Sequence, residues 1–117
     1  GDPGTSPPLS WRGAPDGTKA YAVNMIDTDA DDFVHWGVLN LAAGVHRLAA
    51  GQRSAGAGVI VVRNGFGDTG YGAPCPPSGS PHHYVVTVWA LKRPARSMAD
   101  LPDAALARGS VTVTYQR

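Results

Sequence analysis

The residues that interrupt regular structure constrain this chain more than any other feature. Its 117 residues include 15 glycines and 10 prolines, and every acidic residue is an aspartate. Glycine, proline and aspartate favour turns. Of the good helix formers, glutamate is absent and lysine is nearly absent. The composition therefore predicts short strands joined by many turns.

The apolar pattern divides the chain into strands and one helical segment. Strands are predicted at 19–27, 33–41, 59–64, 83–91 and 110–117. The strand at 83–91, HYVVTVWAL, is expected to lie centrally in its sheet. Residues 97–109 are the single helical candidate, whereas 1–18 and 46–58 are expected to be irregular, with Leu9 and Trp11 anchored on the core. This order predicts an all-β fold in a single domain, 1–117, built as an antiparallel sandwich whose end loops carry any function.

Charge and cysteine content exclude several classes of protein. The net charge is +1 and the arginines are scattered, so we expect no nucleic-acid partner. No apolar run approaches the roughly 20 residues of a membrane span, and no signal peptide is visible. We expect a cytoplasmic protein, with a previously removed signal peptide as the alternative. Cys75 is the only cysteine, which excludes an internal disulfide and a thiolate zinc site.

Two aspartates and a histidine lie near the ends of the first two predicted strands. Asp27 and Asp29 are two residues apart, so their side chains can share one side and hold a proton, orient a histidine or bind a cation. The alternative is a solvated turn in which an aspartate caps the backbone. His35 lies among apolar residues in FVHWGV, which is equally the setting of a packed, hydrogen-bonded core histidine.

A second group precedes the strand at 83–91. If the strand has begun, His82 and His83 point to opposite faces, so one can face a cavity together with Tyr84 while the other faces solvent. Imidazole N–H groups and turn amides together make a plausible anion site. A nucleophilic Cys75 with His82 as its base has only weak support.

Metal and phosphate-loop chemistry have less support. Asp27, Asp29 and one histidine could approximate a facial triad, but no close histidine pair of the H-x-H or H-x-x-x-H kind accompanies them. The stretch GFGDTGYG lacks the lysine and the strand-loop-helix context of a phosphate loop. We therefore expect neither a metal nor a cofactor.

Several stretches, taken together and in order, resemble a known family. They are SPPLSW (6–11), DTDAD (27–31), FVHW (33–36), NGFGDTGYGAPCPPSGSPHHYVVTVWAL (64–91) and ALARGSVTVTYQR (105–117). These stretches are similar to the phosphatidylethanolamine-binding proteins, and most of all to their bacterial, Raf-kinase-inhibitor-like branch. The resemblance covers almost the whole chain and implies a Greek-key β-sandwich with one or two short helices.

The resemblance also implies a ligand site at one end of the sandwich, suited to phosphate-bearing head groups and similar anions. The family's positions fall on Asp27, Asp29, His35, Ala73, Pro74, Cys75, Pro76, Pro77, His82 and Tyr84. The prolines would form a stiff rim around a cavity that His82 enters, with His83 as its outward neighbour.

The chain departs from the family pattern in three places. Thr28 and Asp31 replace the two prolines of the family's DPDAP loop, which predicts a more mobile and more acidic loop. The family's strand before SPPLSW has no counterpart, so we expect a sheet edge that is exposed or filled by a partner chain. Residues 46–58 are rich in glycine and alanine where relatives carry bulkier anchors.

Three functional hypotheses follow, and the first is favoured. The domain binds a small anionic or head-group-like molecule through the positions above. Alternatively it is an enzyme that uses Asp27, Asp29, His35 and His82 as general acids and bases, for example to cyclise, dehydrate or isomerise a secondary metabolite. The third hypothesis is a regulator of a kinase or protease. A homodimer is compatible with each of them.

Overall fold

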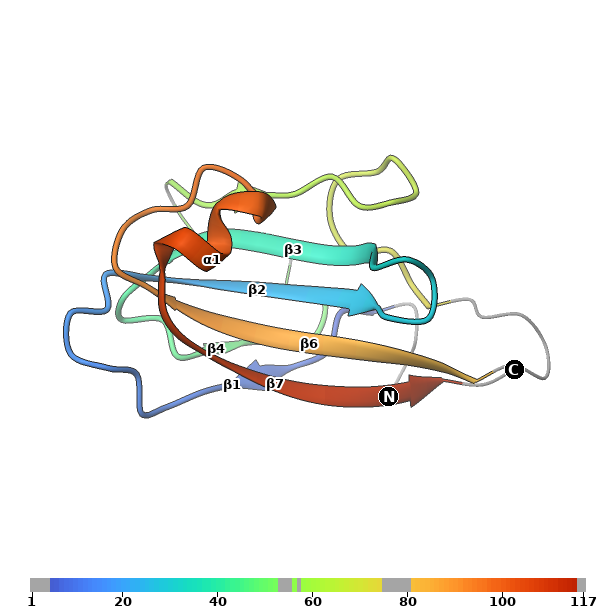
Figure 1. Cartoon of the computed structure of the whole chain (residues 1–117), viewed down its shortest axis with the longest axis horizontal. Coiled ribbons are helices and arrows are strands. Elements are labelled where there is room, and N and C mark those ends of the chain that lie inside the picture. The colour runs from blue at the N-terminus through green and yellow to red at the C-terminus, as the bar shows by residue number, and fades with distance from the viewer. Residues whose placement is uncertain (1–4, 53–55, 57, 75–80, 116–117) are drawn as a thin grey trace.

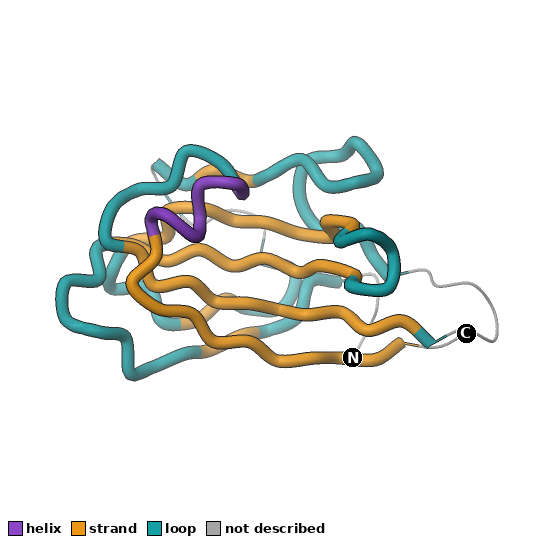
Figure 2. Tube along the Cα trace, in the orientation of Figure 1, coloured by secondary structure: helices purple, strands orange, loops and turns teal. Residues whose placement is uncertain are grey.

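The computed structural model describes residues 5–52, 56, 58–74 and 81–115. Its main sheet has five antiparallel strands in the order β5-β3-β2-β6-β7 (Figure 1). These strands are β2 (Ala20–Asp27), β3 (Phe33–Ala42), β5 (Ile60–Val61), β6 (His82–Leu91) and β7 (Ala105–Tyr115). A second sheet pairs β1 (Leu9–Ser10) with β4 (Arg47–Leu48). A short helical segment, formed by η1 (Met98–Asp100) and α1 (Leu101–Ala104), precedes β7 (Figure 2).

Both faces of the main sheet are covered, which is why β2 is buried along almost its whole length. On one face Tyr21, Val23 and Met25 belong to a core that includes Leu48 of β4. The alternate residues of β2 face the other way, where Ala22 packs in a second core with residues of the η1–α1 segment. The predicted antiparallel β-sandwich is therefore confirmed, with a two-stranded second layer and short helices on the outer face.

The non-sequential strand order follows from the connections. β2 and β3 form a hairpin, β4 lies in the second sheet, and β5 returns beside β3. β6 then pairs with β2 on its other side, so it lies inside the sheet as predicted. Because neighbouring strands are antiparallel, the end of β2, the start of β6 and the end of β7 meet at one end of the molecule.

The prediction of a helix over 97–109 is wrong beyond Ala104. Residues from Ala105 onward pair with β6, beginning with Ala105 opposite Leu91 and continuing through Arg108 opposite Trp89. ALAR has good local helix propensity, but it pairs with β6 instead, across a register shift at Leu106. The helix therefore ends after four residues, and β7 is longer than the predicted strand 110–117.

Other boundaries differ more modestly. The predicted strand 59–64 is reduced to β5 and an isolated bridge between Arg63 and Thr69. Leu9 and Arg47, both in segments expected to be irregular, lie in the short strands β1 and β4. Within the described part of the chain no helix is long and apolar enough to cross a membrane.

Candidate ligand-binding site

Asp27 and His82 form a short hydrogen-bonded pair at the end of the sheet where β2 ends and β6 begins. Asp27 lies opposite Tyr84 in the β2–β6 ladder, which brings His82 within reach of its carboxylate. His82 Nδ1–H donates to Asp27 Oδ2 at 2.6 Å, and the backbone N–H of Asp29 donates to the other oxygen, Oδ1, at 2.9 Å. Both oxygens of a carboxylate that is only 5% exposed are thus satisfied.

A β-bulge orients His35. Met25 of β2 lies opposite Trp36, and the next residue, Ile26, lies opposite Val34, so His35 is the additional residue on β3. Such a bulge re-aims a side chain that strict alternation would place elsewhere.

His35 is tied to the loop before residue 75 by two hydrogen bonds. Its Nδ1–H donates to the carbonyl of Gly72 at 2.8 Å, and the Gly72 N–H donates to the His35 carbonyl at 2.7 Å. Its ring also contacts those of Phe33 and Phe66, with centroids 4.9 and 5.6 Å away. The buried imidazole is therefore fixed on several sides.

Tyr84 joins these two histidines into one group. Its ring is buried and meets His35 edge-on at a centroid distance of 5.2 Å. On the same face of β6, His82 stacks roughly parallel to it at 6.4 Å. We call Asp27, His35, His82 and Tyr84 the two-histidine cluster. The structure brings together these four predicted residues, which come from three strands.

Asp29 makes a different contact. Its Oδ2 accepts hydrogen bonds from the backbone N–H of His83 at 2.7 Å and from His83 Nδ1–H at 2.8 Å. These bonds, the backbone one first, hold the pKa of the Asp29 carboxyl below its ordinary value. Both side chains are about half exposed, at 43% and 53%. Asp29 thus fastens the β2–β3 loop to β6, and its contact with a ligand stays a prediction.

The predicted rim is only partly described. Ala73 is half-buried and Pro74 is buried directly after Gly72, whereas Cys75, Pro76 and Pro77 lie outside the described residues. The stiff proline rim and a nucleophilic Cys75 therefore stay predictions. In the described ranges no group of three histidine, cysteine, aspartate or glutamate side chains is arranged to hold a metal ion.

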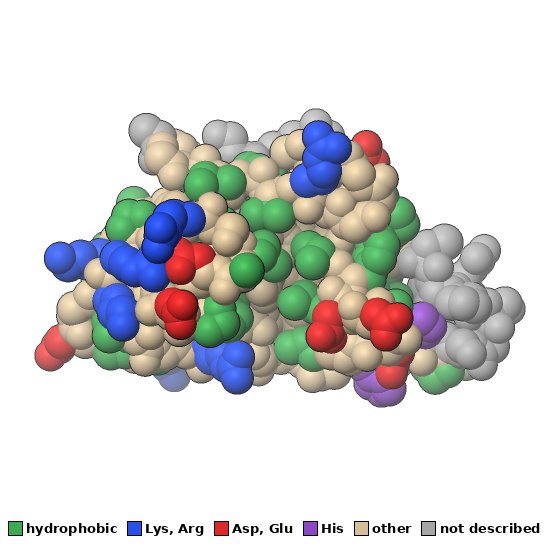
Figure 3. All heavy atoms as spheres, turned by 45° about the horizontal axis from the view of Figure 1, so that its top comes forward, with side chains coloured by type: hydrophobic (Ala, Val, Ile, Leu, Met, Phe, Trp, Pro, Cys, Tyr) green, Lys and Arg blue, Asp and Glu red, His purple; other side chains and the backbone are tan. Residues whose placement is uncertain are grey.

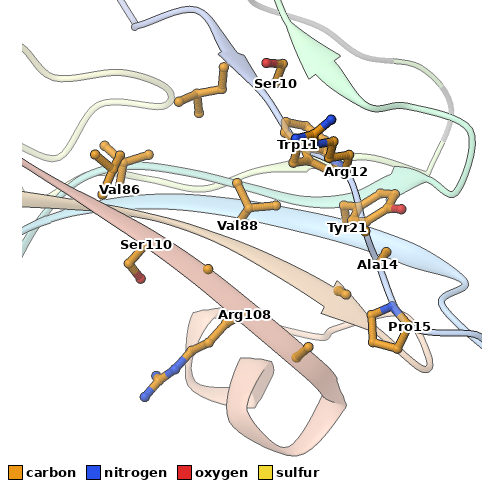
Figure 4. Close-up of a pocket in the computed structure, with 16 residues that line it drawn as sticks. Ser10, Trp11, Arg12, Ala14, Pro15, Tyr21, Val86, Val88, Arg108 and Ser110 are labelled. Carbon is orange, nitrogen blue, oxygen red and sulfur yellow. The ribbon is translucent and has the colours of Figure 1, made fainter.

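Two cavities are found elsewhere on the molecule. A groove of about 510 Å³ is lined by residues 9–15, Tyr21, Val86, Val88, Ala90 and 107–111 (Figure 4). A second cavity, of about 480 Å³, includes Trp36, Val38 and Tyr71. Neither is lined by the two-histidine cluster, so a cavity at the cluster stays a prediction.

Charge is distributed unevenly along the strands. Figure 3 shows histidine side chains beside a group of aspartate side chains at one end of the visible face, whereas most lysine and arginine side chains lie toward the other end, with further aspartates among them. The acidic end holds Asp27, at the end of β2, and the three aspartates of the β2–β3 loop, residues 29–32. None of the described hydrogen bonds or ion pairs joins a lysine or arginine to the cluster.

The aromatic and glycine residues around His35 were missed from the sequence. Phe33 lies within the quoted FVHW, and Phe66 and Gly72 lie within NGFGDTGYG, but nothing local links them to His35. A Cβ on Gly65 would overlap the Phe33 ring, and one on Gly72 would lie 2.6 Å from the Phe66 ring. Gly65 and Gly72 thus permit close aromatic packing.

An antiparallel sandwich with an Asp–His pair and a second fixed histidine at one end defines a class of small β-sandwich domains with a polar end site. A sequence model described as phosphatidylethanolamine-binding protein matches residues 1–116. The chain belongs to the phosphatidylethanolamine-binding protein family.

The relatives found are bacterial. The chain is 46% identical to the UPF0098 protein YbcL of Escherichia coli over 97 residues, which are 75% of this chain and 53% of YbcL. It is 41% identical to YbhB of the same organism over 93 residues, 74% of this chain and 59% of YbhB. The chain thus spans between half and two thirds of the length of these curated relatives.

Solved structures agree with the fold. The crystal structure of Escherichia coli YbcL, described as a new member of the mammalian family, superposes with a TM-score of 0.88 at 36% identity and covers 97% of this chain and 80% of that one. The homologue CT736 of Chlamydia trachomatis gives a TM-score of 0.80 at 27% identity, with 97% and 82% covered. The predicted family and its bacterial branch are confirmed.

Proposed function

We propose that this domain binds a small anionic molecule, bearing a phosphate or carboxylate group or a lipid-like head group, at the two-histidine cluster. The observation that supports this most is the fixed orientation of both imidazoles. His35 and His82 each have Nδ1 committed to a protein acceptor, whereas Nε2 takes part in none of the described hydrogen bonds. Two pre-oriented nitrogens beside a buried tyrosine form a site whose geometry costs little to organise on binding.

Calorimetric titration with inorganic phosphate, phosphoethanolamine and acetate tests the proposal. We expect His82→Ala to weaken the binding of every anion that binds, and His35→Ala to weaken that of inorganic phosphate, each by about tenfold or more, the usual effect of losing a hydrogen bond to a charged group. His46→Ala is the matched control, because His46 is an exposed imidazole outside the cluster. Binding that survives both cluster variants, or a folded wild-type protein that responds to no anion, would refute the proposal.

The second candidate is an enzyme, and the 2.6 Å Asp27–His82 pair favours it over any other alternative. A carboxylate that holds Nδ1–H leaves Nε2 placed to remove a proton from a bound molecule. Deuterium incorporation from heavy water into a bound ligand, lost in Asp27→Asn, is the expected sign of such chemistry. If the wild-type complex shows no exchange, the enzyme hypothesis is rejected and binding without catalysis remains. A role in regulating a kinase or protease, and the cellular compartment, stay predictions.

A further inference from the structure

The hydrogen-bond partners of the two histidines fix the position of their protons. The Gly72 carbonyl and the Asp27 carboxylate can only accept, so Nδ1 of His35 and Nδ1 of His82 must each carry a hydrogen. A neutral imidazole has a single N–H. In the neutral site, therefore, Nε2 of both rings is a hydrogen-bond acceptor.

Two acceptors do not suit an anion. A phosphate, sulfate or carboxylate oxygen would meet the Nε2 lone pairs, beside the buried carboxylate of Asp27 and near that of Asp29. In the part of the chain that the structure describes, the groups that face the rings do not supply a cation. Asp27 and Tyr84 contact His82, and Phe33, Phe66 and Tyr84 surround His35. Because no cationic side chain is described against the rings, an extra proton on an imidazole would supply a donor for the anion.

We propose that the two-histidine cluster takes up its anion together with a proton, an inference that rests on the proposed function. For an anion without an acidic hydroxyl, the proton comes from solvent and binds Nε2 of His82. The resulting N–H then donates to the anion while Nδ1–H keeps its bond to Asp27. No covalent bond within the ligand forms or breaks.

His82 is the ring that takes this proton because of its neighbour. A protonated His82 lies against the Asp27 carboxylate at 2.6 Å, so the two charges compensate. Among the described residues, a protonated His35 would have only a carbonyl and three aromatic rings around it, and His35 is almost completely buried. Neutral His35 instead offers Nε2 to a hydroxyl of the ligand.

This assignment defines the ligand class more narrowly. An oxyanion that carries a P–OH or C–OH beside its charged oxygen donates a hydrogen bond from that hydroxyl to Nε2 of neutral His35. Hydrogen phosphate has such a group, whereas sulfate has the same shape and none near neutral pH. We expect phosphate to bind at least about tenfold more tightly than sulfate near pH 8, since one hydrogen bond to a charged group accounts for that factor.

Proton counting by calorimetry tests the inference directly. Sulfate is titrated into the wild-type protein in two buffers with different ionisation enthalpies, at several pH values. We expect uptake of about one proton per sulfate, and an affinity that falls by up to about tenfold per pH unit once Nε2 is unprotonated in the free protein. Sulfate binding with no proton uptake and no pH dependence would overturn the inference and leave the proposed function standing.

Variants assign the proton to one ring. We expect His82→Asn to abolish proton-coupled sulfate binding, His35→Asn to retain it but lose the preference for phosphate, and His46→Asn to behave as wild type. Circular dichroism establishes that each variant is folded. Proton uptake that persists in His82→Asn would overturn the assignment. A folded wild-type protein that binds neither anion would instead refute the proposed function and this inference together.

Discussion

His35 owes its position in the two-histidine cluster to one extra residue in β3. The bulge between the Met25–Trp36 and Ile26–Val34 pairs turns its ring toward Tyr84 of β6. Gly72 then holds the ring by one hydrogen bond and the His35 backbone by another. An isolated histidine in an apolar strand thus combines both interpretations offered by the sequence. It is a packed, hydrogen-bonded core residue, and it is also part of the candidate site.

At the scale of a residue, Gly65 is predicted to be essential for this packing. A Cβ there would overlap the ring of Phe33, which itself contacts His35, so Gly65→Ala must displace one wall of the site. We expect Gly65→Ala to lower the free energy of unfolding by about 1–3 kcal/mol, the usual cost of overpacking, as measured by urea denaturation.

The matched control is Gly44→Ala, where an added Cβ meets no atom within 4 Å. It should change stability by no more than about 0.5 kcal/mol. Equal effects of the two substitutions would show that steric overlap at Phe33 is not the cause.

At the scale of an element, the segment between β6 and β7 is organised by one aspartate. Asp100 accepts two hydrogen bonds from the Arg93 guanidinium, at 2.7 and 2.9 Å, and one from the Arg96 backbone N–H at 2.9 Å. The Arg93 side chain, first, and the Arg96 amide lower the pKa of Asp100 well below its ordinary value. These bonds hold η1 in place before α1 and β7.

The pH dependence follows from the direction of this shift. Because the folded-state pKa of Asp100 is depressed, its contribution to stability is present above the ordinary carboxyl pKa of about 3.9. That contribution is lost as the pH falls below this value toward the folded-state pKa. We expect the melting temperature of the wild type to fall more steeply from neutral to acidic pH than that of Asp100→Asn.

Differential scanning calorimetry across this pH range provides the measurement. Asp103→Asn is the control, because Asp103 is an exposed neighbour in α1 for which no side-chain hydrogen bond is described. Its pH profile should parallel that of the wild type. Parallel profiles for Asp100→Asn and wild type would contradict the role given to Asp100.

At the scale of the whole molecule, β7 is an edge of the main sheet. Among the described strands it pairs only with β6, and Val111 and Leu106 on it are 53% and 43% exposed. Long edge strands with exposed apolar side chains are templates for pairing with another chain. The homodimer predicted from the sequence therefore has a plausible surface here, although it stays a prediction.

We expect the chain to self-associate through β7 and Val111→Lys to shift it toward the monomer, since a charge on an edge strand opposes edge pairing. Light scattering over a range of concentrations measures the change. Ala99→Lys, on the exposed η1 segment, should leave association unaltered. A wild-type chain that is monomeric at every concentration would exclude β7 as a dimer edge.

The sequence by itself determined the positions of β2, β3 and β6, the family and the identities of the four clustered residues, because strand alternation and the quoted motifs can be recognised within short segments. It also determined that His83 would lie on the opposite face of β6 from His82. These properties depend on the period of a strand and on residues adjacent in the chain.

Only the tertiary structure decided where 105–109 belongs, which histidine Asp29 contacts, and how His35 is held. Each depends on partners distant in the sequence: β6 for 105–109, His83 at a separation of 54 residues for Asp29, and Gly72 at 37 for His35. Backbone groups pair wherever the assembled sheet offers a partner, and that pairing overrides local propensity. The same distant contacts place the protons on the two imidazoles, and the proposed ligand preference depends on that placement.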